Sequence, residues 1–250
     1  MKKISVIIPA YNEEGNIRLV LVEVTEFFKQ VGLSQYEILV VDDASRDKTA
    51  EVVKDFIHHD HNVRLLQNKQ NQGLGYNYRF GLSQASSQYA MLIPGDQEVV
   101  LDSLTPAIKY IDQTDVIIPF ALNPEEVRTG SRLLLSRLFT LGLNFLFRLN
   151  LKYYNGPVIA RTKLAIQFVS SSASFAYMAV MLVKMLKAGA CYEQAGFLLR
   201  GRPTGKTKAF SFKNIVGVFK DIATLYCRIG FKKEKISVIA NTKVTVDFKS

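Results

Sequence analysis

Clusters of carboxylates and turn residues stand directly after three short apolar runs of the sequence. They occupy residues 9–14 (PAYNEE), 42–45 (DDAS) and 94–98 (PGDQE). Carboxylates that gather on one rim repel each other, so such a rim calls for a cation or a hydrogen-bonding ligand. Each cluster alone has a simpler interpretation, because Asp42 or Asp43 with Ser45 can cap a helix, and Glu13 and Glu14 can favour a helix N-terminus. The three clusters together favour a ligand site.

Asp96 and Glu98 have the spacing of a metal-binding pair. One residue separates them, so on an extended segment both side chains point the same way and can share a cation. Carboxylate oxygens suit Mg²⁺ or Mn²⁺, and either ion can bridge a substrate diphosphate. The histidine-rich segment at residues 58–61 (HHDH) follows a helix end, and we expect an exposed turn there rather than a metal site.

The elements that carry these clusters are predicted by the apolar pattern. Runs rich in Ile and Val at residues 4–10, 37–41 and 89–93 are typical of buried parallel strands, and residues 63–67 and 116–119 predict two more. Apolar residues at helical spacing predict helices over residues 16–31, 47–57 and 74–86. Strands and helices that alternate in this way form a doubly wound α/β sheet. Ligands of such a sheet bind outside the carboxyl ends of its strands, which is where the clusters fall.

The second half of the chain is more apolar and more basic. Residues 133–149 are apolar but contain Arg137 and Arg148, which favours a helix lying in a membrane interface over one that crosses it. Residues 164–183 are uncharged, yet Gln167 and several serines indicate a loop followed by a soluble helix over residues 174–188. We also expect a strand at residues 191–199, an amphipathic helix at 212–229 and an edge strand at 243–248. No spanning helix is predicted.

Composition and charge exclude several classes of protein. The 250 residues are 48% hydrophobic, which excludes a disordered or collagen-like chain. Cys191 and Cys227 cannot build a disulfide framework, and the N-terminal apolar run is expected to be a strand rather than a signal peptide, so we expect a reducing, cytoplasmic location. Residues 1–125 carry a net −6 and residues 126–250 a net +16, within an overall +10. The positive charge shows no aromatic-interleaved motif, so no nucleic-acid partner is expected.

Four segments in this order resemble the family 2 glycosyltransferases, which have the GT-A fold: SVIIPAYNEEGNI, EILVVDDASRDKT, NQGLGYNYRFG and the acidic turn GDQE. The resemblance covers residues 3–120 and is strongest to the dolichol/polyprenyl-phosphate mannose synthase branch. It implies a nucleotide-sugar pocket with Asp42 at the base or ribose. The other residues implied to line the nucleotide are Pro9, Ala10, Tyr11, Glu13, Asn71, Gly73 and Arg79.

The resemblance also implies catalytic and metal-binding residues. The acidic turn is similar to the family's DXD motif, with Pro94 in place of the first Asp, which leaves Asp96 and Glu98 to hold Mg²⁺ or Mn²⁺. Arg132 opens a segment (RLLLS) similar to the one that receives the lipid phosphate. Arg202 and Lys206 lie in a loop (RPTGKTK) similar to the branch's RxxGxS loop, and such a loop can close over a diphosphate. The catalytic residues implied are thus Asp96, Arg132 and Arg202.

These implications predict a membrane-associated enzyme with one catalytic domain. Residues 1–125 would form the nucleotide-sugar half, residues 126–210 the acceptor half with its interface helix and basic loop, and residues 211–250 an amphipathic helix and tail. The expected reaction is inverting transfer of one sugar from a nucleotide diphosphate to a polyprenyl phosphate, on an anionic membrane surface at the cytoplasmic face. A saccharide acceptor and a weakly active nucleotide-sugar-binding scaffold stay open as alternatives, as does a homo-oligomer.

Overall fold

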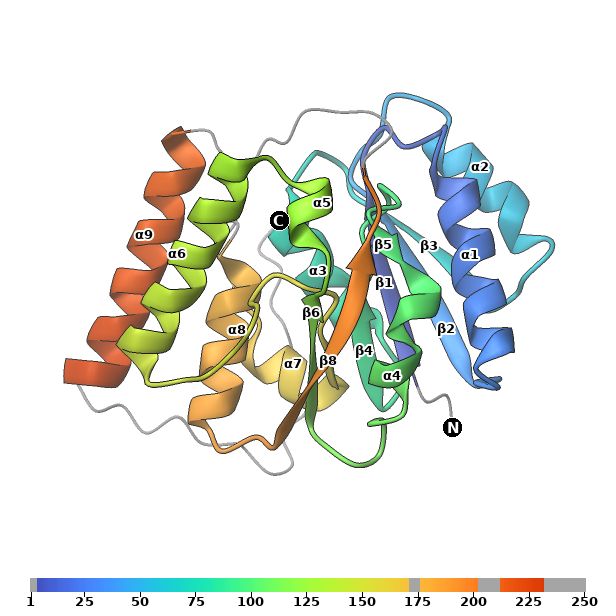
Figure 1. The fold of residues 1–250 in the computed structure, drawn as a ribbon. Helices are drawn as coiled ribbons and strands as arrows, with labels where there is room; N and C mark the ends of the chain where they lie inside the picture. Colours follow the sequence, from blue (N-terminus) through green and yellow to red (C-terminus); the bar gives the residue numbers. More distant parts are fainter. Residues whose placement is uncertain (1–3, 171–175, 202–211, 232–250) are drawn as a thin grey trace.

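One mixed sheet of eight strands organises the protein (Figure 1). The structure is a computed structural model that describes residues 4–170, 176–201 and 212–231. The sheet continues across residue 125 without a break, and helices cover its faces. The predicted α/β fold class is therefore confirmed.

The first half of the chain forms the doubly wound part of the sheet. Its four strands, β1 to β4, are parallel, and helices α1, α2 and α3 connect them. The bounds agree with the predicted ranges to within two residues at most ends: β1 Ile4–Ala10, α1 Ile17–Gln30, β2 Tyr36–Asp42, α2 Thr49–Ile57, β3 Val63–Gln67, α3 Leu74–Gln84 and β4 Tyr89–Leu92.

Burial on both faces explains why the central strands are continuous apolar runs. Every residue of β1 is buried, and its side chains alternate between two cores. Val6 and Ile8 join the core that includes α1 and α2, whereas Ile7 joins the core that includes α3. A parallel sheet with helices on both faces needs this pattern, since each strand must be apolar on its two sides.

The second half of the chain extends the same sheet. The strands β6 Val116–Ala121 and β8 Tyr192–Leu199 are parallel to each other, while β7 Ile159–Arg161 lies antiparallel between β4 and β6. The short β5 Val99–Val100 pairs antiparallel with the end of β8. The full strand order is β3-β2-β1-β4-β7-β6-β8-β5. The helical elements here are η1 Leu101–Leu104, α4 Thr105–Ile108, α5 Pro124–Val127, α6 Gly130–Phe147, α7 Thr162–Phe168, α8 Tyr177–Lys187, α9 Phe212–Tyr226 and the π-helical η2 Cys227–Phe231.

Two elements differ from the sequence-based expectation. The segment before residue 174 was expected to be a loop, but it contains α7, whose Leu164, Ala165 and Phe168 are buried in the core. The strand β7 was not predicted, because three residues are too few to show an alternation of apolar and polar positions. The expected edge strand at residues 243–248 lies outside the described residues.

Helices α6 and α9 lie beside each other at one end of the molecule (Figure 1). Phe147 of α6 contacts Tyr226 of α9 edge-on, with ring centroids 6.1 Å apart. The remainder of α6 is largely uncovered, because Leu143 and Phe147 are its buried residues. Among the residues that the structure describes, no helix combines the length and the apolar composition needed to span a bilayer.

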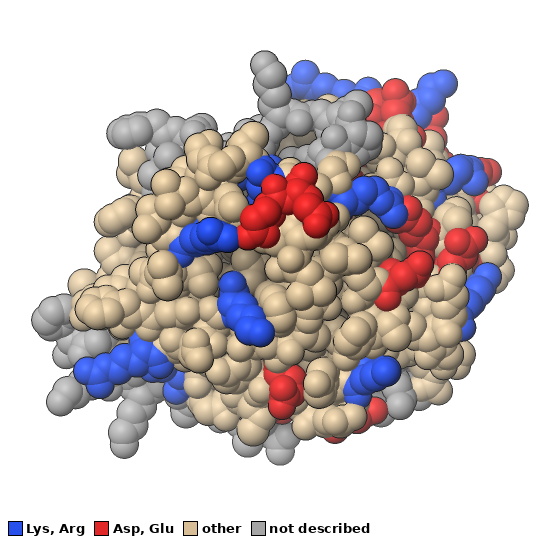
Figure 2. Space-filling model, viewed as in Figure 1, with Lys and Arg blue, Asp and Glu red and all other residues tan. Residues whose placement is uncertain are grey.

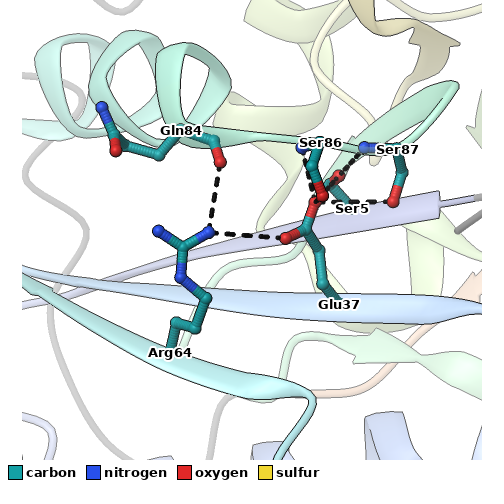
Figure 3. A network of polar contacts seen from close by, with 6 residues as sticks. All are labelled: Ser5, Glu37, Arg64, Gln84, Ser86 and Ser87. Atoms are coloured by element: carbon teal, nitrogen blue, oxygen red, sulfur yellow. Dashed lines mark hydrogen bonds and ion pairs between the residues drawn. The ribbon is translucent and has the colours of Figure 1, made fainter.

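A buried carboxylate ties the amino ends of the parallel strands together (Figure 3). Glu37 is 1% exposed, and its Oε1 accepts hydrogen bonds from the Ser5 hydroxyl at 2.6 Å and the Ser86 amide at 2.6 Å. The hydroxyls of Ser86 and Ser87 donate to the same oxygen, and Arg64 lies 3.6 Å from Oε2. This network joins β1, β2 and β3 to the start of β4, at the opposite end of the strands from the acidic clusters.

Candidate functional site

The three acidic clusters lie at the carboxyl ends of β1, β2 and β4, as predicted. Because β1, β2 and β4 are parallel, these ends meet at one rim of the sheet. Each cluster contains a non-glycine residue with a left-handed backbone: Asn12 (φ 57°), Ala44 (φ 59°) and Gln97 (φ 56°). Such conformations are uncommon and concentrate at functional sites, where the surrounding contacts hold them. The rim therefore consists of three tightly turned loops.

Hydrogen bonds join the loop after β1 to the loop after β2. The Asn12 amide donates to Ser45 Oγ at 3.0 Å, and the Arg46 amide donates back to Asn12 Oδ1 at 2.9 Å. The Glu13 amide donates to Thr49 Oγ1 at 2.8 Å. Reciprocal bonds of this kind fix the two loops against each other, so the predicted nucleotide-lining residues of β1 and the following loop have a rigid support.

Asp47 strengthens this junction as an ionised carboxylate. It accepts hydrogen bonds from the Thr49 amide and hydroxyl at 3.0 and 2.5 Å and from the Glu14 amide at 3.1 Å. Burial acts to raise the pKa of Asp47, but these hydrogen bonds outweigh it and hold the pKa below its usual value. Because Asp47 bonds the Thr49 amide, helix α2 begins at Thr49 rather than at the predicted residue 47.

Asp42 and Asp43 are both buried, and each already has partners. Asp42 Oδ1 accepts the Ser45 amide at 3.1 Å and Oδ2 accepts the Gln67 side chain at 3.2 Å, so Asp42 holds the turn after β2. The helix-capping alternative is wrong, because α2 begins at Thr49 with Lys48 at its N-cap and no side-chain hydrogen bond caps it. Asp43 accepts hydrogen bonds from the amides of Gln72 and Gly73, at 2.8 and 2.9 Å. Asp43 was absent from the predicted site residues, although the Asp-Asp doublet was a signal that could have found it.

The loop before α3 is held by Asp43, and it contains two of the predicted nucleotide-lining residues. Asn71 Nδ2 donates to the backbone oxygen of Asp43 at 3.4 Å. Gly73 has φ 86°, a left-handed conformation that favours glycine, and directly precedes α3. Arg79 lies on α3 with its guanidinium 5.3 Å from the ring centroid of Tyr76. Asn71 and Gly73 are thus placed beside the β2 end, on the same rim.

The acidic turn after β4 packs against the end of β1. A Cβ added to Gly95 would lie 3.4 Å from the backbone oxygen of Pro9, which is ordinary van der Waals contact, so the two segments lie side by side. The Glu98 amide donates to Asp96 Oδ1 at 3.3 Å, and the Glu98 backbone oxygen accepts the Arg200 amide at 2.8 Å. The premise that residues 96–98 are extended is wrong, because Gln97 is left-handed and the Asp96 carboxylate turns back onto the chain.

The acidic turn also meets the first turn of α6. Arg132 Nη2 lies 3.7 Å from Glu98 Oε1, and the two side chains are 26% and 16% exposed. The residue predicted to receive the acceptor phosphate therefore lies against a residue predicted to hold the cation. Neither spacing in the sequence nor the apolar pattern indicated this contact.

The carboxylates of the acidic turn fit a cation only if a substrate completes its coordination. The described residues contain no group of three or more His, Cys, Asp or Glu side chains able to hold a metal ion. Mg²⁺ is commonly bound through one or two carboxylates together with substrate phosphates and water. Asp96 and Glu98 supply that number of carboxylates and so fit such an ion by the type and number of their oxygen ligands, although the turn at Gln97 replaces the extended arrangement predicted for them.

The segment at residues 153–157 precedes β7, which pairs with β4 and β6. A Cβ on Gly156 would lie 2.4 Å from the backbone oxygen of Pro119, so this loop packs tightly on β6. Arg128 donates to the Tyr153 hydroxyl at 2.8 Å. The Tyr154 hydroxyl donates to Asn144 of α6 at 2.8 Å, and burial raises the pKa of Tyr154, which keeps this donor protonated. Arg128 was missed by sequence reasoning, which offered no motif around it.

Two predicted site residues, Arg202 and Lys206, lie outside the described residues. The last residue before them, Gly201, is described, and a Cβ added to it would lie 3.6 Å from Val127 Cγ1. Gly201 therefore lies beside α5, the helix that precedes α6. The histidines at residues 58, 59 and 61 are exposed, as expected, and Asp60 between them accepts hydrogen bonds from Thr25 and Tyr36.

The fold and rim define an α/β protein of the GT-A class. Over 89% of this chain it is similar to the S. aureus TarS fragment 1–349 in complex with UDP-GlcNAc, with a TM-score of 0.66, 20% identity and 65% of that chain covered. It is also similar to glucosyl-3-phosphoglycerate synthase from Mycobacterium tuberculosis in complex with Mg²⁺ and UDP, with a TM-score of 0.62, 16% identity, and 90% and 79% of the two chains covered.

Residues 5–172, more than half of the chain, match the family model described as Glycosyl transferase family 2. The protein belongs to this family. A curated relative from Dictyostelium discoideum, named dolichyl-phosphate beta-glucosyltransferase, is 33% identical over 99 residues, which are 37% of this chain. The match covers 30% of that relative's length.

Proposed function

We propose that the protein is an inverting glycosyltransferase that moves one sugar from a nucleotide diphosphate to a polyprenyl phosphate. The observation that carries this proposal is the contact between Glu98 and Arg132, at 3.7 Å. It brings a candidate cation ligand of the donor side next to a candidate phosphate-binding residue of the acceptor side. An enzyme that joins a sugar diphosphate to a phosphate needs these two sites to be neighbours.

The relatives support both substrates. The Dictyostelium discoideum relative is named for a dolichyl-phosphate acceptor, and the Mycobacterium tuberculosis structure contains Mg²⁺ and UDP. For this chain we propose that residues 1–125 serve the nucleotide sugar and that residues 126–210 serve the acceptor, followed by an amphipathic helix and tail. The nucleotide would lie along the rim between Tyr11, Asp42 and the loop that Asp43 holds.

The proposed reaction balances without a strong general base. An oxygen of the acceptor phosphate attacks the anomeric carbon, the bond from that carbon to the donor diphosphate breaks, and the nucleoside diphosphate leaves with the electron pair. A phosphate monoester is already ionised near neutral pH, so no side chain has to remove its proton. Arg132 would bind the acceptor phosphate through its planar fork of donors, and Arg202 and Lys206 would neutralise the leaving diphosphate. A divalent cation held by Asp96 and Glu98 would supply further positive charge to that diphosphate.

The surface of α6 supports a membrane-bound acceptor. Large apolar side chains of α6 that are about half exposed or more form a stripe at helical spacing: Leu134, Leu138, Leu141 and Phe145. In Figure 2 the surface over α6 and α9 is mostly uncharged, whereas acidic side chains gather over α5. We propose that this stripe enters the headgroup region of the cytoplasmic leaflet and brings Arg132, at the start of the same helix, to the lipid phosphate.

The experiment that tests this function is a transfer assay. The protein is incubated with labelled nucleotide sugars, a divalent cation, and undecaprenyl or dolichyl phosphate in vesicles, and we expect label in the lipid fraction. Label found only in a water-soluble saccharide would favour the saccharide-acceptor alternative, and label in neither fraction would favour a scaffold.

Asp96 provides the matched test of the donor side. We expect Asp96→Asn to lower lipid labelling about 100-fold or more, because the leaving diphosphate loses its bound positive charge. Asp102→Asn, in the nearby η1, removes the same charge outside the rim and should leave labelling unchanged. Full activity of Asp96→Asn would contradict the assignment of the cation to this turn.

A further inference from the structure

We propose that the Glu98–Arg132 ion pair is a latch that makes acceptor binding depend on prior binding of the donor. This inference rests on the proposed function and concerns the order in which its two substrates bind. In the substrate-free protein, the negative charge of Glu98 neutralises the guanidinium of Arg132, so Arg132 has little charge to offer an acceptor phosphate. Binding of the nucleotide diphosphate and its cation on the donor side releases Arg132 from Glu98.

The positions of the two side chains make the contact more than a surface pair. Glu98 and Arg132 are 16% and 26% exposed, whereas Glu125 of α5 and Arg137 of α6, which form another ion pair, are 54% and 61% exposed. Screening by water weakens the exposed pair far more than the covered one. The Glu98–Arg132 contact is therefore the less screened of the two pairs.

A cation and Arg132 compete for the same carboxylate. Both are positive, so a divalent ion bound at the acidic turn attracts Glu98 and repels the guanidinium that now lies beside it. Only the Glu98 side chain has to move, because its amide is bonded to Asp96 and its backbone oxygen to the Arg200 amide. The acidic turn can thus exchange partners while its backbone stays in place.

Release of the Arg132 guanidinium sets the order of binding, with the donor before the acceptor. Arg132 is on the first turn of α6, the helix whose apolar stripe we assign to the membrane, so it is near the acceptor once its charge is free. An acceptor phosphate then meets Arg132 after the nucleotide diphosphate and its cation are seated. The latch keeps the acceptor site weak until the nucleotide diphosphate and its cation are bound.

Binding of farnesyl phosphate, a short isoprenoid phosphate, tests the latch without relying on activity. We expect equilibrium dialysis of the wild-type protein to show about five- to tenfold tighter binding when Mn²⁺ and UDP are present, with GDP as a parallel arm, a range typical of coupled sites. Glu98→Gln should bind the probe at the tighter affinity with neither Mn²⁺ nor nucleotide. Asp96→Asn, which removes the same charge two residues away, should keep the weak affinity, and so should Glu125→Gln.

Binding on the donor side gives a second measurement. If Glu98 holds Arg132 in the free protein, then Arg132→Gln should bind Mn²⁺ with UDP more tightly, because Glu98 no longer has to leave the guanidinium before it joins the cation. Arg137→Gln, the matched change on the same helix, should not. Calorimetric titration measures both.

The outcomes separate the latch from the function on which it rests. The latch is overturned if wild type and Glu98→Gln bind farnesyl phosphate equally well, or if Glu98→Gln and Asp96→Asn gain affinity equally. The proposed function still stands in either case if sugar label enters the lipid fraction. If Arg132→Gln binds the probe as well as wild type does and no label enters lipid, the acceptor assignment is wrong and the latch is overturned with it.

Discussion

Glu37 carries a buried negative charge at the amino ends of the parallel strands, away from the rim where ligands are expected. Four hydrogen bonds from three serines reach its Oε1, and Arg64 lies beside its other oxygen. A buried carboxylate is tolerated when its oxygens are satisfied in this way, and removing it leaves the donors without a partner. This network serves the stability of the sheet and not the chemistry of the rim.

We therefore expect Glu37→Ala to lower the free energy of unfolding by about 3 kcal/mol, because the buried Ser5 hydroxyl and the Ser86 amide lose their acceptor. Urea denaturation measures this change. Arg18→Gln is the control, since the Arg18–Asp55 pair is 48% and 56% exposed and should contribute about 0.5 kcal/mol. Similar losses for the two variants would show that the network has no special role.

At the residue scale, the loops of the rim contain strained backbone conformations. The left-handed residues Asn12, Ala44 and Gln97 stand at the ends of three adjacent strands, and hydrogen bonds of Asn12 with Ser45 and Arg46 hold the first two loops together. The sequence predicted which residues follow the strands but not their backbone angles, because Ala44 and Gln97 have no intrinsic preference for positive φ. This is why the extended geometry assumed for residues 96–98 was wrong.

At the scale of elements, the apolar pattern predicted the buried strands well and the short elements poorly. β1 has the predicted bounds, because residues buried on both faces must be apolar throughout and turn residues close the run. β3 also has the predicted bounds, although it is an edge strand in which only Val63 is buried. β7 and α7 have three and seven residues, too few for a period to show, and tertiary contacts with β4, β6 and the core define them. The Glu98–Arg132 contact depends on how β5 and α6 are placed, which no local pattern contains.

The exposed apolar side chains of helix α6 are expected to contribute to membrane binding. Replacing Leu138 or Phe145, which are 55% and 84% exposed, by Ser should weaken binding to vesicles about tenfold each, because each change removes roughly 1.5 kcal/mol of apolar burial in the membrane interface. Co-sedimentation with vesicles containing phosphatidylglycerol measures this binding.

Leu19 on α1 offers a matched control for these variants. It is 52% exposed, close to Leu138, but lies on a helix of the donor half. Leu19→Ser should bind vesicles like the wild type. Equal losses for Leu19→Ser and Leu138→Ser would mean that α6 is not the membrane-binding element.

At the scale of the whole molecule, the two halves of the chain share one sheet but differ in charge. Residues 1–125 carry a net −6 and residues 126–250 a net +16. The strand pairs β4–β7 and β6–β8 cross the boundary, so the division is electrostatic and lies within a single fold. We expect such a molecule to orient itself at an anionic surface, because the surface would attract one half and repel the other.

The charge division predicts that vesicle binding depends on salt and on the position of each charge. We expect binding to phosphatidylglycerol vesicles to fall about tenfold or more between low and high ionic strength, since each basic residue near the surface contributes about 1 kcal/mol that salt screens. Arg148→Asn, at the exposed end of α6, should weaken binding about fivefold, and asparagine tolerates the left-handed backbone of that position. Lys109→Gln removes one exposed positive charge from the acidic half and should leave binding unchanged. Binding that is indifferent to salt, or equal losses in both variants, would mean that net charge alone and not its division between the halves directs the protein to the membrane.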